Sequence, residues 1–224
     1  MLGDDAHDQA VYFKAVAVDR FGNSYITGFG DGVLNDKPLV GHFDALVSSY
    51  DSAGRIRFVR TWGTKGDDRG YGIAVDSEQN IFACGVSKTT NSWNEFRASG
   101  YNNPEKLLRV ASFPEKVSAF AIKFDRDAKQ QFQIQMPGQQ HANRVLADQH
   151  GNFYLGGYLM LTKHLGSNGD EIWRDNLPSN YGRIMGLGLD KHERSVVCGS
   201  MAVPNTGQEE EHQSDGFVVR YLND

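Results

Sequence analysis

The stretch AVDRFGNSYITG (Ala17–Gly28) decides the fold, because close variants of it recur along the chain. Two runs of alternating apolar residues flank the pair Gly22 and Asn23, and this pattern indicates a β-hairpin. Three further stretches share its length and plan: AVDSEQNIFACG (Ala74–Gly85), LADQHGNFYLGG (Leu146–Gly157) and GLDKHERSVVCG (Gly188–Gly199). An internal repeat of this kind predicts one supersecondary unit that is built several times over.

Each stretch is anchored on an aspartate and closes nine residues later on a glycine. The anchors are Asp19, Asp76, Asp148 and Asp190. The residues four positions after them are Asn23, Asn80, Asn152 and Arg194. Asp and Asn suit tight turns because they bond to the nearby backbone and tolerate left-handed conformations. We therefore interpret the aspartate, the Gly–Asn pair and the closing glycine as turn chemistry between two strands.

A second half of the repeat follows each hairpin. FDALVSSYDSAGRIRFVRTWG (Phe43–Gly63) matches SAFAIKFDRDAKQQFQIQMPG (Ser118–Gly138) and YLMLTKHLGSNGDEIWRDNLP (Tyr158–Pro178). Each unit therefore predicts strand, turn, strand, variable loop, strand, turn and strand. The shortest spacing between anchors, 42 residues from Asp148 to Asp190, suits a four-stranded propeller blade of about 40–50 residues.

The predicted fold is all-β, a β-propeller of four blade-like repeats of four antiparallel strands, in a single domain over residues 1–224. The repeats lie at about 10–63, 70–138, 143–178 and 183–224. The last blade lacks its outer strand, so the segment Phe217–Leu222 is expected to be an open sheet edge that a partner strand can extend. The sequence leaves three alternatives for completing the ring: a four-bladed ring with one three-stranded blade, a larger ring of two chains, or a longer polypeptide with more blades.

The units resemble the SBBP family of β-propeller repeats, which read roughly A-x-A-V-D-x-x-G-N-x-Y-x-x-G and then D-A-F-V-x-K-x-D-x-x-G. The first unit matches best, with Ala15 to Asp19, the Gly22–Asn23 pair, Tyr25 and Gly28. The second has Gln79 in place of the turn glycine, and the fourth has lost the Gly–Asn pair. The resemblance extends from about Gly3 to Asp224. It implies the architecture and an extracellular or surface location, and it carries no shared catalytic motif.

Composition narrows the function classes. The net charge is −5, which disfavours nucleic-acid binding because that needs a cationic surface. No apolar run is long enough for a membrane span, and no signal peptide is visible at the start.

The two cysteines, Cys84 and Cys198, are expected to be small buried strand residues, and unpaired thiols favour an intracellular location. Together with the family resemblance this leaves the compartment open. No motif indicates a cofactor, and the seven histidines lack metal-ligand spacing.

Polar connectors between the units form the first candidate site. GDDRG (Gly66–Gly70) links the outer strand of one unit to the inner strand of the next, and each unit has a counterpart. Loops on a rigid scaffold commonly carry function, and these connectors are expected to meet near the propeller axis. The alternative is that they are ordinary links between blades. The predicted ligand-binding residues are Asp67, Asp68, Arg69, His141, Asn143, Tyr181 and Arg183.

The second candidate is the long insertion Lys88–Val117, which is rich in apolar and aromatic side chains. Its predicted partner-binding residues are Trp93, Phe96, Tyr101, Leu107, Leu108 and Phe113. Such a loop either packs on its own blade or forms a partner surface. The leading hypothesis is thus a non-catalytic interaction or scaffold module that engages a protein partner or larger assembly. The alternative is binding of a carbohydrate or small ligand at the polar connectors, and an enzyme on the same face ranks third.

Overall fold

The structure is a computed structural model of the chain, and it describes residues 10–34, 37–88, 117–137, 141–158, 160–176, 182–202 and 214–221. These residues form β-strands and turns, with fifteen antiparallel strands arranged in four sheets and a small separate hairpin. None of the described residues forms a helix long and apolar enough to cross a membrane.

The first two sheets have four strands each. The first sheet runs in the order β1 (Val11–Val18), β2 (Ser24–Gly30), β5 (Asp44–Tyr50) and β6 (Ile56–Trp62). The second sheet is formed by β7 (Asp67–Val75), β8 (Ile81–Lys88), β9 (Val117–Phe124) and β10 (Gln130–Pro137). Between β2 and β5, the short strands β3 (Val33–Leu34) and β4 (Lys37–Pro38) pair as a hairpin inside an insertion that the repeat leaves unspecified.

The third sheet also has four strands, whereas the fourth has three. The third sheet is formed by β11 (Ala142–Ala147), β12 (Phe153–Gly157), β13 (Met160–His164) and β14 (Glu171–Asn176). The fourth sheet consists of β15 (Gly182–Leu189), β16 (Ser195–Ala202) and β17 (Ser214–Arg220). The predicted antiparallel strands of the four units are therefore confirmed, and within the described residues the last sheet has three strands and ends at β17.

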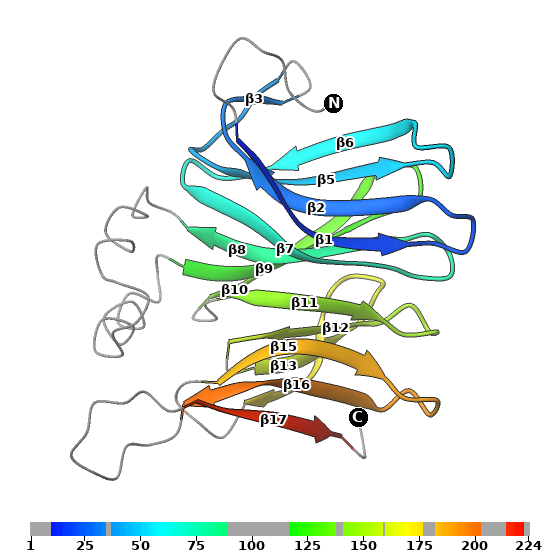
Figure 1. Cartoon of the computed structure of the whole chain (residues 1–224), viewed down its shortest axis with the longest axis vertical. Helices are drawn as coiled ribbons and strands as arrows, with labels where there is room; N and C mark the ends of the chain where they lie inside the picture. Colours follow the sequence, from blue (N-terminus) through cyan, green and yellow to red (C-terminus); the bar gives the residue numbers. More distant parts are fainter. Residues whose placement is uncertain are drawn as a thin grey trace, which may run out of the picture.

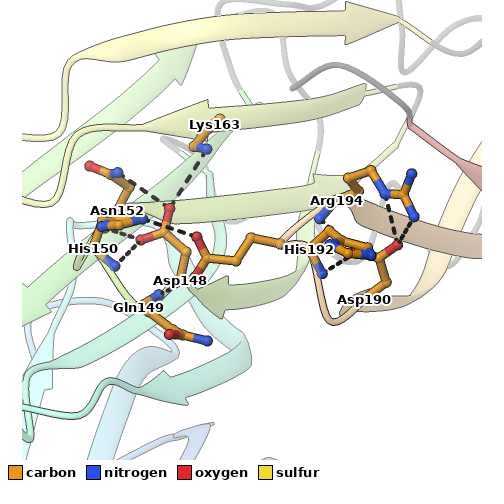
Figure 2. A network of polar contacts seen from close by, with 9 residues as sticks. Asp148, Gln149, His150, Asn152, Lys163, Asp190, His192 and Arg194 are labelled. Carbon is orange, nitrogen blue, oxygen red and sulfur yellow. Dashed lines mark hydrogen bonds and ion pairs between the residues drawn. The ribbon is translucent and has the colours of Figure 1, made fainter.

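The repeated aspartate organises the turn between the first two strands of each sheet. One oxygen of Asp148 accepts hydrogen bonds from the backbone N–H groups of His150 and Asn152, at 3.0 and 2.8 Å. Its other oxygen accepts from the Asn152 amide at 3.3 Å and lies 3.6 Å from the Lys163 Nζ (Figure 2). In the fourth sheet Arg194 replaces the asparagine, and its Nε donates to the Asp190 carboxylate at 2.8 Å. The turn therefore survives the loss of the Gly–Asn pair.

The closing glycine does not belong to the turn, contrary to the sequence interpretation. Gly85 lies within β8 opposite Gly70, where β7 carries a bulge. A Cβ on Gly85 would lie 1.9 Å from the carbonyl oxygen of Arg69, so only glycine fits under the bulged strand. The same distance of 1.9 Å recurs at Gly28, Gly157 and Gly199. The close approach of two backbones thus requires a glycine at this position, once in each sheet.

The four sheets stack in chain order, and their first strands lie beside one another. Strand β7 packs against β1 and β2, β11 packs against β7 and β8, and β15 packs against β11 and β12. Apolar clusters fill these junctions, with Tyr25, Val47 and Ile73 at the first of them. The first and fourth sheets stand at opposite ends of the stack, so the described strands do not form a closed ring (Figure 1).

Candidate functional site

The polar connectors place a group of charged side chains where the inner strands begin. Strand β7 starts at Asp67, and Lys88 at the end of β8 is its partner across the ladder. Residues directly opposite each other in an antiparallel pair project from the same face. Both side chains are almost fully removed from solvent, at 1% and 2% exposed, respectively. A carboxylate and an ammonium group are thus buried side by side at one end of the second sheet.

Few donor groups lie close to the oxygens of the buried Asp67 carboxylate. His42 Nδ1 lies 3.4 Å from one of its oxygens, and neither oxygen has a hydrogen-bond partner among the described residues. Burial raises the pKa of Asp67 above its ordinary value, and the positive charges of Arg69, His42 and Lys88 oppose that shift. Its pKa is therefore sensitive to any charged group that enters beside it.

Lys88 is affected by the same burial in the opposite sense. Burial, followed by repulsion from Arg69, lowers the pKa of Lys88 to about 8, against the attraction of Asp67. At neutral pH the ammonium group therefore carries its charge with little water around it. A desolvated cation of this kind gains more from an incoming anion than an exposed lysine does.

Arg69 is held by aromatic rings. Its guanidinium carbon lies 4.5 Å from the ring centre of Phe29 and 4.7 Å from that of Phe43. Both contacts are within the range of cation–π attraction, and they fix a side chain that otherwise has many rotamers. The first two sheets thereby position a guanidinium group next to the Asp67–Lys88 pair.

The third and fourth sheets contribute His141 and Arg183. The His141 ring lies 5.9 Å from Tyr71 and 5.8 Å from Tyr158, centre to centre. Arg183 lies over the same Tyr158 ring at 4.9 Å, and a β-bridge joins these two residues. Burial, then repulsion from Lys88, Arg183 and Arg69, lowers the pKa of His141 to about 3. At neutral pH the imidazole is therefore uncharged and lies among cations.

The repeat explains why these residues meet. Arg69, His141 and Arg183 each stand seven residues before an anchor aspartate, and Tyr12 holds that position in the first unit. Because the first strands of successive sheets are neighbours, one repeat position becomes a row across the molecule. We call Asp67, Arg69, Lys88, His141 and Arg183 the inner cluster.

The remaining predicted site residues divide into three groups. Asp68 accepts hydrogen bonds from Thr64, from its N–H at 2.6 Å and its hydroxyl at 2.9 Å, so its carboxylate holds its own connector in shape. The Asn143 amide nitrogen is buried without a hydrogen-bond partner among the described residues. Tyr181 lies outside the described residues, as do Trp93, Phe96, Tyr101, Leu107, Leu108 and Phe113, so the partner-binding surface stays a prediction.

Two residues differ from what the sequence suggested. In the sequence, Lys88 marks only the start of the insertion, although it is paired with Asp67 by the same register that sets Gly85 against Gly70. Asp67 lies three residues before Gly70 and Lys88 lies three residues after Gly85, so the pairing of the two glycines also predicts the pairing of Asp67 with Lys88. Cys84 is buried as expected, whereas Cys198 is exposed. They occupy the same repeat position, and the difference arises because the next sheet covers Cys84 while no described sheet covers Cys198.

Known proteins resemble this chain in structure only. No family model and no curated protein matches its sequence, so the SBBP resemblance stays a prediction. A protein of unknown function from Bacteroides caccae is 6% identical with a TM-score of 0.50, over 91% of this chain and 61% of that one. A gluconolactonase from Xanthomonas campestris is 12% identical with a TM-score of 0.48, over 84% of this chain and 54% of that one. This chain thus spans little more than half the length of these structures.

No group of three or more His, Cys, Asp or Glu side chains that could hold a metal ion occurs in the part of the chain that the structure describes. Cations instead dominate the inner cluster, and the rings of Phe29, Phe43 and Tyr158 pack against its guanidinium groups. Such a set can hold and orient an acidic group, because guanidinium and ammonium donors suit carboxylate and phosphate oxygens.

Proposed function

We propose that the four sheets are consecutive blades of a β-propeller and that the chain is a non-catalytic binding module for a small acidic ligand. The inner cluster is the proposed site. The observation that carries the proposal is the buried Asp67–Lys88 pair with Arg69, His141 and Arg183 gathered around it from three successive sheets.

Charge favours an acidic ligand. Arg69, Lys88 and Arg183 carry three positive charges, and Asp67 is the negative charge set against them within the cluster. His141 adds none at neutral pH because its pKa is so low. Three of the five cluster residues are thus cations on a chain whose net charge is −5, and such a concentration of cations attracts an acidic group.

Preorganisation favours a small ligand. Aromatic rings hold Arg69 and Arg183 in place, which reduces the side-chain entropy lost on binding. The rings of Tyr71 and Tyr158 beside His141 offer apolar faces next to the charges. A carboxylate or phosphate on a compact polar body, such as a sugar acid, combines these features. Capture of a protein partner by the insertion 88–117 is the other proposal that the sequence supports.

Calorimetric titration tests the ligand class. Glucuronate and inorganic phosphate serve as acidic probes, and glucose serves as the neutral control. We expect binding of at least one acidic probe, no measurable binding of glucose, and at least about tenfold weaker binding in Arg183→Gln. The matched control is Arg55→Gln, which removes the same charge from an exposed turn where Arg55 pairs with Asp51. Equal loss of affinity in both variants, or binding of neither acidic probe, would overturn the proposal.

A further inference from the structure

We propose that the outer face of the fourth sheet is a docking surface for strand β1 of a second copy of this chain, so that two copies associate head to tail. The face of each sheet that looks towards the next sheet in chain order is called its forward face, and the opposite one its backward face. Three junctions inside the chain each join a forward face to a backward face. Within the described residues, no sheet covers the forward face of the fourth sheet or the backward face of the first.

The internal junctions define which residues meet. A Cβ on Gly70 of β7 would lie 2.3 Å from the Thr27 hydroxyl of the first sheet. At the next junction the Cys84 thiol donates to the carbonyl oxygen of Ala142 at 3.4 Å. At the third, a Cβ on Gly156 would lie 2.7 Å from Ile184. In each case the residue before a closing glycine meets the residue that pairs with the next sheet's closing glycine.

The same rule pairs Cys198 with Phe13. Cys198 precedes the closing Gly199, and Phe13 is the partner of the closing Gly28 in the first sheet. Each internal pair contains at least one small residue, namely Gly70, Ala142 and Gly156. Cys198 lies in a groove of about 400 Å³ with Met185, Phe217 and Val218 and two glycines. An aromatic ring at Phe13, half exposed in a single copy, suits that groove.

The solvent exposure of equivalent residues shows that both of these faces are uncovered in a single copy. On the backward faces, Ile73 and Val145 are 8% and 7% exposed, whereas Val16 at the same repeat position is 64% exposed. On the forward faces, Ala121 and Leu161 are 1% and 0% exposed, whereas the equivalent Val218 is 75% exposed. Val218 occupies a position that all three internal junctions bury, and Val16 occupies one that the first two junctions bury and the third, at Leu187, buries in part. Exposed apolar patches of this kind mark interaction surfaces.

A second copy is the occupant that the chain itself specifies. The first and fourth sheets lie at opposite ends of the stack, so within one copy they do not cover each other (Figure 1). A second copy supplies β1, whose Phe13 is the residue expected to meet Cys198. Two such junctions join two copies into one ring of eight sheets, which is within the range known for propellers.

Analytical ultracentrifugation of the purified chain over a concentration series tests the inference. We expect a dimer of twice 24.9 kDa, with its dissociation constant raised at least tenfold in Val16→Asp and in Val218→Asp. Val40→Asp is the matched control, because Val40 is also 64% exposed but lies outside the strands, between β4 and β5. A mixture of Val16→Asp and Val218→Asp should dimerise through its one intact junction. A monomeric wild type, or equal weakening by Val40→Asp, would overturn the inference.

Cross-linking supplies an independent readout. Phe13→Cys should form an intermolecular disulfide with Cys198 when oxidised glutathione is added, visible as a covalent dimer. Val40→Cys, tested in the same way, should not. Absence of the covalent dimer in Phe13→Cys also counts against the inference, and it indicates that a different protein or further sheets cover this face.

Discussion

Lys88 stands directly opposite Asp67 in the ladder between β7 and β8, and both side chains are almost fully buried. Burial disfavours the charged form of each, which is why the pKa of Asp67 rises while that of Lys88 falls. The pair thus costs stability in the unliganded protein. An acidic ligand is expected to recover part of that cost by placing its own negative charge beside Lys88.

Raising the pH is expected to remove the free-energy cost of burying the charged form of Lys88. Its pKa falls from 10.5 to about 8 on folding, so between these values the unfolded chain binds the extra proton. Stability therefore rises as the pH passes from about 8 to about 10, by at most roughly 3 kcal/mol. Urea unfolding at several pH values measures the rise, and Lys88→Met should lack it. An identical pH dependence in both proteins would show that Lys88 is not the group responsible.

The closing glycine of each sheet should tolerate no side chain. Gly85→Ala places a methyl group against the Arg69 carbonyl, so we expect the free energy of unfolding to fall by about 3 kcal/mol. Gly188→Ala is the control, because no atom lies within 4 Å of its Cβ position. Chemical denaturation of both variants checks this. A similar loss in the two would mean that strand flexibility, and not close approach, explains why glycine recurs at this position in the four sheets.

Restoring the repeat's turn glycine should stabilise the second unit. Gln79 has a φ of 67°, in the region that costs non-glycine residues roughly 1–2 kcal/mol. Gln79→Gly is therefore expected to raise the free energy of unfolding by up to about 1 kcal/mol. The melting temperature and urea midpoint should both increase. A decrease would indicate that the Gln79 side chain makes a stabilising contact of its own.

Glu193→Gly should gain less, although Glu193 also has a positive φ, of 60°. Its carboxylate accepts a hydrogen bond from the Gln149 N–H at 3.0 Å and lies 3.1 Å from His150 Nε2, which ties the turns of the third and fourth sheets together. Glycine removes that link. A larger gain at this position than at Gln79 would show that the link contributes nothing.

The sequence predicted the sheets well and the site partly, for physical reasons. Turn chemistry at Asp19 or Asp148 is local, so its residues are adjacent in the chain and the repeat displays them. The role of Gly85 depends on a bulge in the neighbouring strand, which no local pattern reveals. Cys198 was expected to be buried like Cys84, because repeat position alone does not say whether another sheet follows. Lys88 required the register of β7 against β8.

The most direct test of the proposed site is an NMR titration that follows the His141 ring. With a pKa of about 3, the ring should stay neutral from pH 5 to pH 8, and its signals should be constant over that range. Addition of glucuronate or inorganic phosphate should then shift those signals in the wild type and much less in Arg183→Gln. Ligand-induced shifts that leave His141 unmoved would contradict the assignment of the inner cluster as the binding site.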